Sequence, residues 1–213
     1  MPMNALASHS RALYQDVAEL LRQRIFAREL EPGAWIDELR IAQELGISRT
    51  PLREAIKVLA AEGLVTMKLR RGAYVTEVSE QDLRDVYHLL ALLESDAAAV
   101  VAQNATDAEL EELVTLQRDL AAATADRELF FRINEAFHLR LLAVANNRWR
   151  DQMVADLRKV MKLNRHSSLL KSGRIAQSLA EHQAIVDALT LRDPTLAAQR
   201  MQAHFASGLQ AAA

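Results

Sequence analysis

The chain has 213 residues, half of them apolar and a quarter charged, with a formal net charge of −2. This composition predicts a soluble globular protein, and the net charge by itself says nothing about nucleic acid. The absence of cysteine excludes a disulfide framework and thiolate chemistry, and we expect a cytoplasmic protein. The longest apolar stretch, residues 89–102, is interrupted by Glu94, Ser95 and Asp96, so no membrane span is expected.

Charge and glycine are unevenly distributed along the chain. Residues 49–71 hold six Lys or Arg against two acidic residues, a local basic excess that the whole-chain charge hides. Four of the six glycines lie before residue 73, so turns are dense at the front and sparse behind. We therefore expect two domains, residues 1–78 and residues 79–213.

The first domain has the element pattern of a winged helix-turn-helix. Apolar residues recur at helical spacing at its start, Pro32-Gly33 indicates a turn, and Gly46 ends a short second helix. Ser48 or Thr50 is expected to cap a third helix, with Pro51 in the first turn. The expected elements are helices over 11–28, 37–45 and about 50–63, and strands over 64–68 and 73–77.

The third helix carries both an apolar face and cations. Leu52, Ala55, Ile56 and Leu59 share the apolar face on a helical wheel, whereas Arg49, Arg53 and Lys57 recur at a spacing of four. A recognition helix contacts DNA bases mainly with its N-terminal residues, and arginine can grip guanine with two hydrogen bonds. Lys57 lies deeper along the helix and is better placed for a phosphate.

The alternative is that these cations form a solvated surface, with Glu54 as an ion-pair partner. For one amphipathic helix that interpretation would be preferred. The preceding short helix, the glycine turn and the basic hairpin tip at Arg70 and Arg71 together favour DNA.

The segments GISRTPLREAIKVLAAEGLV, RRGAYVTEV and LEPGAWIDELRIAQELG resemble the signature of the GntR family of bacterial transcription regulators, over residues 11–78. The resemblance implies that Arg49, Thr50 and Arg53 read an operator and that Arg71 and Gly72 form a wing contact. Family members often use an arginine of the second helix as well, for which Arg40 is the nearest candidate, although Leu39 occupies the matching position. The DNA-binding residues expected in all are Arg40, Ser48, Arg49, Thr50, Arg53, Arg70, Arg71 and Gly72.

The second domain reads as an antiparallel bundle of helices, so the fold class is mainly α. Ser79 to Asp82 resembles a capping box with aspartate in the glutamate position, and Asp193-Pro194 opens the last helix. The helices are expected over about 80–104, 106–125, 127–146, 148–170, 174–192 and 194–210.

Three histidines lie in three different predicted helices of this bundle: His138, His182 and His204. Asn134 precedes His138 by one turn and shares its face. Three imidazoles and an oxygen make a plausible transition-metal site, although a single histidine on a helix is more often structural or exposed.

Residues 80–208 are similar to the FCD ligand-binding domain, and the similarity is strongest in EHQAIVDALTLRDPTLAAQRMQAHF. In many of its members an aspartate and three histidines bind zinc, nickel or a similar ion. The positions that match are Asn134, His138, His182 and His204. The neutral Asn134 replaces the aspartate, which should weaken metal affinity.

A second departure concerns the effector. The first helix of such domains often presents an arginine to an anionic effector, and Leu90 stands at that position here. Another cation, Arg140 or Arg165, is expected to serve an organic-acid effector instead.

These features predict a homodimeric, ligand-controlled transcription regulator, expected to be a repressor, that binds a near-palindromic operator. Two other hypotheses remain. One is a metallohydrolase in which Glu135 or Glu181 acts as the base, but each lies beside a histidine in sequence and points about 100° away from it. The other is an architectural DNA binder, which the mildly acidic second domain argues against.

Overall fold

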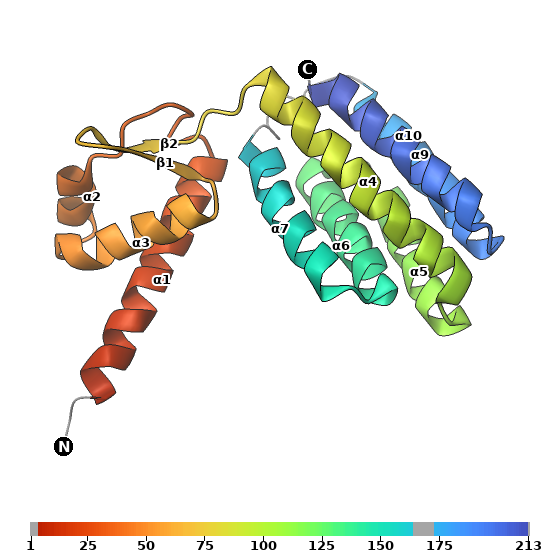
Figure 1. The fold of residues 1–213 in the computed structure, drawn as a ribbon, viewed down its shortest axis with the longest axis horizontal. Helices are drawn as coiled ribbons and strands as arrows, with labels where there is room; N and C mark the ends of the chain where they lie inside the picture. Colours follow the sequence, from red (N-terminus) through yellow and green to blue (C-terminus); the bar gives the residue numbers. More distant parts are fainter. Residues whose placement is uncertain (1–3, 164–172, 213) are drawn as a thin grey trace. The chain divides into compact units, whose positions relative to one another are not determined.

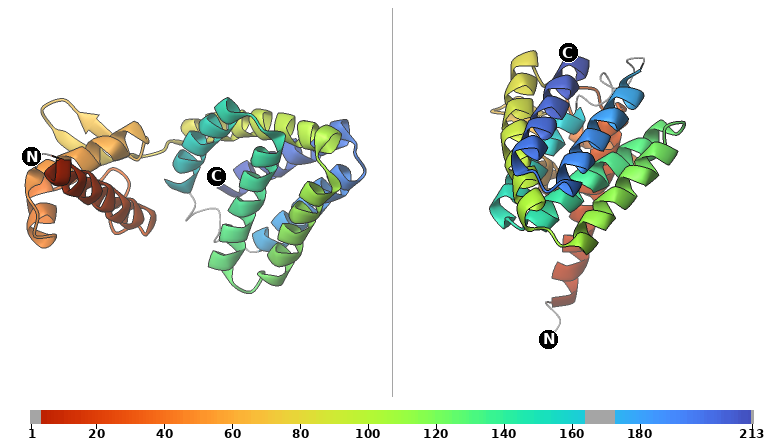
Figure 2. Two further views of the ribbon diagram at one scale, coloured as in Figure 1. Left: turned by 90° about the horizontal axis from the view of Figure 1, so that it is seen from below. Right: turned by 90° about the vertical axis from the view of Figure 1, so that its right-hand side faces the viewer.

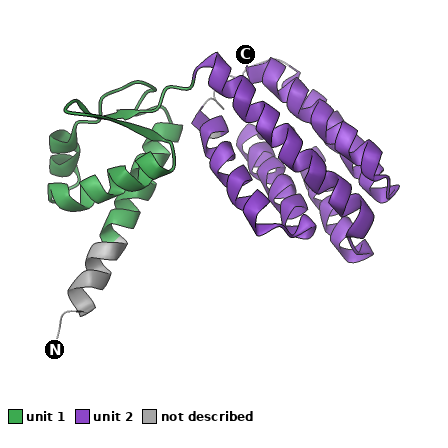
Figure 3. Cartoon of the chain, viewed as in Figure 1, with its two compact units in different colours: residues 1–78 green, residues 79–213 purple. Residues whose placement is uncertain are grey.

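The computed structural model describes residues 4–163 and 173–212. It divides into two compact units, Met1–Val78 and Ser79–Ala213 (Figure 3). Helices dominate both, and the one sheet of the described residues is a two-stranded hairpin in the first unit. The predicted fold class, mainly α with a winged helix-turn-helix before a helical domain, is confirmed.

The first unit contains three helices and the hairpin (Figure 1). The first helix begins seven residues earlier than expected, because residues 4–10 contain no glycine or proline to stop it. Helix α3 packs against α1, α2 and β1. The elements are α1 (Asn4–Phe26), α2 (Glu38–Glu44), α3 (Arg49–Ala61), β1 (Val65–Lys68) and β2 (Gly72–Val75).

Local signals start the two helices of the helix-turn-helix. Asp37 caps α2, since its side chain accepts hydrogen bonds from the backbone N–H groups of Leu39 and Arg40. Ser48 is the N-cap of α3, but its side chain makes no capping hydrogen bond. The predicted apolar face of α3 is confirmed as buried, and it comprises Leu52, Ala55, Ile56 and Leu59.

The hairpin is short and its tip is exposed. Strands β1 and β2 are antiparallel, with Val65 opposite Val75 and Lys68 opposite Gly72. Gly72 has a φ of +94°, and a Cβ there would lie 3.0 Å from the indole nitrogen of Trp35. Glycine therefore meets both the backbone conformation and the close approach that this turn requires.

The second unit consists of helices packed side by side (Figure 2). Helix α4 packs along α10 and also contacts α6 and α7, whereas α5 packs on α6 and α9. No helix among the described residues is long and apolar enough to cross a membrane. The helices are α4 (Glu80–Asn104), α5 (Asp107–Ala122), α6 (Arg127–Ala145), α7 (Arg148–Leu163), α9 (Arg174–Thr190) and α10 (Pro194–Ala212).

Capping boxes stabilise the N-terminal ends of the first two of these helices, α4 and α5. Ser79 and Asp82 exchange side-chain and backbone hydrogen bonds at the start of α4, as predicted, and Thr106 and Glu109 do the same for α5. The predicted continuation of the fourth bundle helix over residues 164–170 lies outside the described residues. Large fully buried side chains such as Leu90, Leu120, Phe130 and Phe137 form the core.

Candidate functional site

The N-terminal end of α3 presents two arginines at the surface of the first unit. Arg49 is the first residue of the helix and Arg53 follows one turn later, and their side chains are 53% and 56% exposed. Both contact the carboxylate of Glu38, the first residue of α2. Lys57 is exposed as well and pairs with Glu54 within the same helix. The pair with Glu54 that the solvated-surface interpretation predicts thus exists for Lys57, whereas the two arginines pair with Glu38 instead.

The remaining DNA-binding candidates are also accessible, apart from Gly72, which is half-buried in the hairpin. Arg70 and Arg71 lie at the hairpin tip, where Arg70 has a φ of +59°. Leu39, the residue at the position where the family often has arginine, is 57% exposed. The other exposed candidates are Arg40, Ser48 and Thr50.

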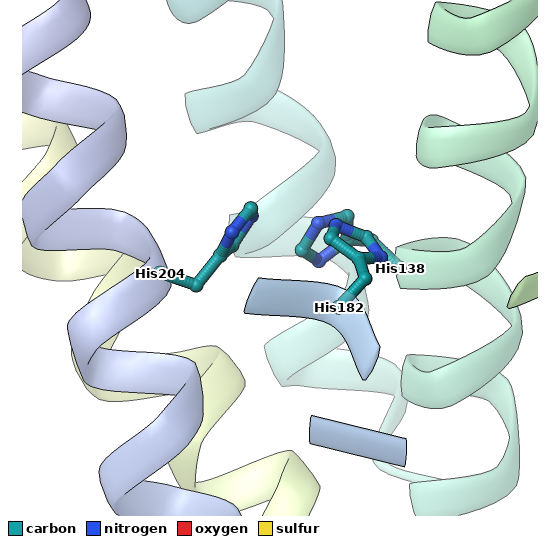
Figure 4. Close-up of side chains that lie close together, drawn as sticks. All are labelled: His138, His182 and His204. Carbon is teal, nitrogen blue, oxygen red and sulfur yellow. The ribbon is translucent and has the colours of Figure 1, made fainter. Parts of the chain in front are cut away.

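The three predicted histidines converge inside the second unit. His138 comes from α6, His182 from α9 and His204 from α10, and their rings face one another (Figure 4). One nitrogen of each lies within 4.8 Å of one nitrogen of both others, and all three residues are buried. The ring centroids of His182 and His204 are 4.7 Å apart. Imidazoles brought this close suit a shared cation better than a packed apolar core.

Two of these rings form a hydrogen bond with a carboxylate through Nδ1. His138 Nδ1 lies 2.6 Å from Glu94 Oε2, and His204 Nδ1 lies 2.8 Å from Glu181 Oε2. Each carboxylate in turn accepts hydrogen bonds from an arginine, Arg158 for Glu94 and Arg174 for Glu181. Such carboxylate–histidine pairs fix the ring orientation and leave Nε2 available to a metal.

His182 differs from the other two histidines. It is fully buried, yet neither Nδ1 nor Nε2 has a hydrogen-bond partner in the structure. A buried polar atom without a partner costs about 1–3 kcal/mol, and such atoms in native proteins call for an explanation. A metal ion bound by the three histidines would provide one, so the residues fit a divalent transition metal.

Two histidines of the triad border a cavity within the second unit. His138 and His204 line it, and so does Asn134, the predicted fourth ligand. Arg158 and Arg174 supply cations to its wall, and aromatic rings of Tyr87, Phe130, Phe131 and Phe205 supply apolar surface.

Of the two predicted effector cations, the structure describes Arg140. Arg140 is not among the residues that line the cavity and pairs with Glu112 at a distance of 2.6 Å. Arg165 lies outside the described residues. Leu90, at the family's arginine position, is buried in the core. The arginines that do line the cavity, Arg158 and Arg174, were not among the residues predicted from the sequence.

The structure also shows where the two glutamates of the hydrolase hypothesis lie. Glu181, one of the two imagined bases, already binds Arg174 and His204. Glu135, the other, lines the cavity.

Burial and charge set the protonation of this cluster. Burial lowers the pKa of His138 to about 4, although Glu94 opposes the shift. Burial also lowers the pKa of His182 well below its usual value, and the neighbouring histidines and arginines add to the effect. For Glu94, burial would raise the pKa, but Arg158 and His138 outweigh it and hold the pKa at about 2. At neutral pH, His138 and His182 are therefore neutral, which is the form that binds a metal.

Acidification from pH 7 to pH 5 is expected to destabilise the metal-free second unit. The unfolded chain takes up protons on these histidines below a pH of about 6.5, whereas the folded chain does not until about 4 for His138. His138 and His182 then each lower the free energy of unfolding by up to about 1.4 kcal/mol per pH unit. Glu94 adds to the loss of stability as the pH falls from about 4.5 towards 2.

Urea unfolding in the presence of a chelator measures this effect. In a Trp35→Phe background the fluorescence of Trp149 reports the second unit alone, because these are the two tryptophans of the chain. Replacing the exposed His88 by glutamine should leave the pH dependence unchanged. An unfolding free energy that is constant between pH 7 and pH 5 would contradict the assigned neutral state.

Comparison with models of known protein families shows to which family the chain belongs. The model described as "Bacterial regulatory proteins, gntR family" matches residues 13–75, and the model of the FCD domain matches residues 85–207. The chain belongs to the GntR family and carries an FCD domain. A GntR protein with this second domain is a DNA-binding transcriptional regulator with an effector-binding domain, so the two units correspond to those two activities.

Relatives extend over nearly the whole chain. An uncharacterized HTH-type transcriptional regulator in an unstable DNA locus of Streptomyces ambofaciens is 32% identical over 206 residues, which cover 92% of this chain and 84% of that protein. A probable D-xylose utilization operon transcriptional repressor of Paenarthrobacter nicotinovorans is 30% identical, with coverage of 92% and 87%. These relatives are regulators, so this GntR-family chain is not assigned as an enzyme.

Solved structures show the same fold. McbR/YncC of E. coli superposes with a TM-score of 0.74 at 23% identity and covers 91% of this chain, and 93% of its own chain is matched. A GntR regulator from Rhodococcus sp. RHA1 gives a TM-score of 0.73 at 24% identity, with coverage of 92% and 95%.

Proposed function

We propose that this GntR-family regulator is a homodimeric repressor that binds a near-palindromic operator and responds to a small organic acid bound in the cavity of its second unit. The observation that carries the proposal is the exposure of Arg49 and Arg53 at the start of α3, on the same unit as an exposed basic hairpin tip. In this proposal the recognition helix enters the major groove and the hairpin reaches a neighbouring groove or the backbone.

The roles of the DNA-binding residues follow from their positions. Arg49 and Arg53 contact base edges, with Thr50 beside them, because they occupy the first turn and a half of α3. Arg70 and Arg71 contact the DNA from the hairpin, and Gly72 permits its turn. Arg40 and Ser48 lie at the exposed surface of the same unit and are proposed to contact phosphates.

The proposed metal ligands are His138, His182, His204 and Asn134. The two carboxylate-bound rings offer Nε2, and His182 has no other partner for either nitrogen. Three imidazoles select an ion such as zinc or nickel, and a neutral amide oxygen as the fourth ligand would bind it more weakly than a carboxylate. When bound, the ion would supply positive charge and a coordination position for an oxygen of the effector.

An anionic effector is supported by the cations in the cavity wall. Arg158 and Arg174 line the cavity from α7 and α9, whereas the family's usual arginine position holds the buried Leu90. The aromatic side chains around them favour a ligand with an apolar part. Arg158 and Arg174 are therefore better placed for the carboxylate than Arg140, which does not line the cavity.

Dimerisation is supported by apolar side chains left on the surface of the second unit. Leu89 and Leu92 on α4 and Trp149 and Met153 on α7 are between 43% and 68% exposed, and the two helices pack together. A second copy would cover them. Two DNA-binding units would then meet two half-sites, and an effector that favours one state of the dimer would change operator affinity.

Repression is proposed by analogy with relatives. The Paenarthrobacter protein is named a probable operon repressor, and the 26% identical RspR of Escherichia coli is named a transcriptional repressor. Because the proposed regulator reads DNA in the cell interior, the proposal includes a cytoplasmic location.

The test begins with wild-type protein and a randomised pool of DNA duplexes. The expected result is enrichment of one motif with two inverted half-sites, bound by a species of twice the 23.8 kDa chain mass in light scattering. Recovery of unrelated sequences with no shared motif would instead support the architectural interpretation. A binding motif without internal symmetry would overturn the homodimeric arrangement.

The effector is sought by thermal shift. Small carboxylates are added to the protein with and without Zn²⁺ or Ni²⁺, and ligands that raise the melting temperature are then added to the operator complex. An organic acid is expected to raise the melting temperature and to lower operator affinity. If no carboxylate shifts the melting temperature under either condition, the organic-acid assignment fails.

A further inference from the structure

One carboxylate joins the two arginines at the start of α3. Glu38 Oε2 lies 2.7 Å from Arg53 Nε and 3.2 Å from a terminal nitrogen of Arg49. Glu38 is the first residue of α2, so this contact links the two helices of the helix-turn-helix. Its side chain is 18% exposed, against 53% and 56% for the arginines. Glu38 is therefore more shielded from solvent than either arginine.

Glu38 accepts a hydrogen bond from one nitrogen of Arg53, and this decides which N–H donors of that arginine remain for DNA. Arg53 uses Nε, so both of its terminal nitrogens stay available to another group. Two N–H groups of one guanidinium match the O6 and N7 acceptors of guanine in the major groove. Because Glu38 already restricts the side chain, less conformational entropy is lost when Arg53 meets a base.

The charge of Glu38 acts differently on phosphates and on bases. Arg49 and Arg53 are one helical turn apart and repel each other, and a nearby carboxylate offsets this repulsion. Burial would raise the pKa of Glu38, but Arg53 and Arg49 outweigh it and lower the pKa, so the carboxylate is ionised at neutral pH. A DNA phosphate that approached either arginine would meet this negative charge, whereas a neutral base edge would not be repelled in the same way.

We propose that Glu38 is a positioning residue that directs Arg49 and Arg53 to base edges and disfavours their use on phosphates. It thereby increases the preference of the protein for its operator over other DNA. A repulsive element of this kind is a recognised source of specificity, because specificity is a difference between two affinities. The inference rests on the proposed operator-reading role of the two arginines.

The test compares Glu38→Gln with Glu44→Gln. Both substitutions remove one negative charge from α2, but Glu44 pairs with Arg24 and contacts neither Arg49 nor Arg53. Binding is measured to the duplex that the wild-type protein selects from a randomised pool and to a scrambled duplex, at several salt concentrations. Circular dichroism and the melting temperature establish that each variant is folded.

Glu38→Gln is expected to bind the scrambled duplex more tightly and to lower the ratio of operator to scrambled affinity about tenfold. The salt dependence on scrambled DNA should steepen by about 0.9 for each additional phosphate that the variant neutralises. Glu44→Gln should leave the ratio close to that of the wild type. An equal change in both variants would overturn the inference, since only the added charge would then matter.

A second variant separates position from charge. Glu38→Asp keeps the charge but is one methylene shorter, so it is expected to hold the arginines less well and to give an intermediate ratio. If Glu38→Gln does not fold, this variant decides, and a ratio equal to that of the wild type would overturn the positioning role. If the wild-type protein itself shows no sequence preference, the proposed operator binding fails. If the wild-type protein prefers its operator and Glu38→Gln keeps the full preference, only the present inference fails.

Discussion

Replacing Arg53 by alanine is expected to lower the affinity for the selected operator between about thirty-fold and about twenty-thousand-fold in the proposed dimer. One bidentate arginine–guanine contact supplies about 1–3 kcal/mol of discrimination, and two protomers would each lose one. Arg53 is 56% exposed and outside the buried face of α3, so the fold should be retained. The measurement is a titration of labelled operator and scrambled duplexes, and the loss should fall mainly on the operator.

Two control variants help to interpret the result for Arg53→Ala. Arg118→Ala removes the same charge from an exposed site of the second unit, where Arg118 pairs with Glu111, and should leave operator affinity nearly unchanged. Lys57→Ala is expected to weaken binding to both duplexes similarly and to reduce the salt slope, as the loss of a phosphate contact does. If Arg53→Ala weakened binding to both duplexes alike, Arg53 would be a phosphate contact and not a reader of bases.

The sequence predicted the first unit well because its signals are local. The buried face of α3 follows from helical spacing, Gly46 and Gly63 end helices, and Gly72 permits the hairpin turn. The convergence of His138, His182 and His204 was predicted through family resemblance, since spacing alone does not say which helix faces meet. Their distances in the structure agree with that expectation.

The contacts between distant residues were not predictable in the same way. Glu94 lies on the buried face of α4, between Leu90 and Ala98, and a charge on an apolar face signals a buried partner. That signal does not identify the partners, which are His138 and Arg158, 44 and 64 residues later. The contact of Glu38 with Arg49 and Arg53 likewise depends on how α2 packs on α3.

The same reasoning applies to the cations of the cavity. Arg140, one of the two predicted effector cations, pairs with Glu112, and Arg165 lies outside the described residues. The cavity wall instead receives Arg158 and Arg174, each held by a carboxylate that also contacts a histidine. Charge partners of this kind depend on tertiary packing. The helical periodicity of one segment does not predict that packing.

Replacing His182 by leucine is expected to abolish stabilisation by Zn²⁺ without destabilising the metal-free protein. Leucine has a similar size, and it removes two buried nitrogens that have no hydrogen-bond partner. The metal-free variant should therefore be as stable as the wild type, or more stable by about 1–3 kcal/mol. The wild type should gain about 2.7 kcal/mol when the free metal concentration is about a hundred times the Kd, and the variant should gain almost nothing.

Thermal unfolding with chelator and with Zn²⁺ or Ni²⁺ measures both effects, and calorimetric titration counts the ions bound. His88→Leu is the matched control, because His88 is an exposed histidine of α4 outside the triad and should leave the metal-induced shift intact. Asn134→Asp is expected to increase metal affinity, since an anionic ligand replaces a neutral one. A metal-free His182→Leu variant that is strongly destabilised would instead mean that His182 is held by packing for the fold alone. A metal-induced shift that survives in this variant would show that the ion binds elsewhere.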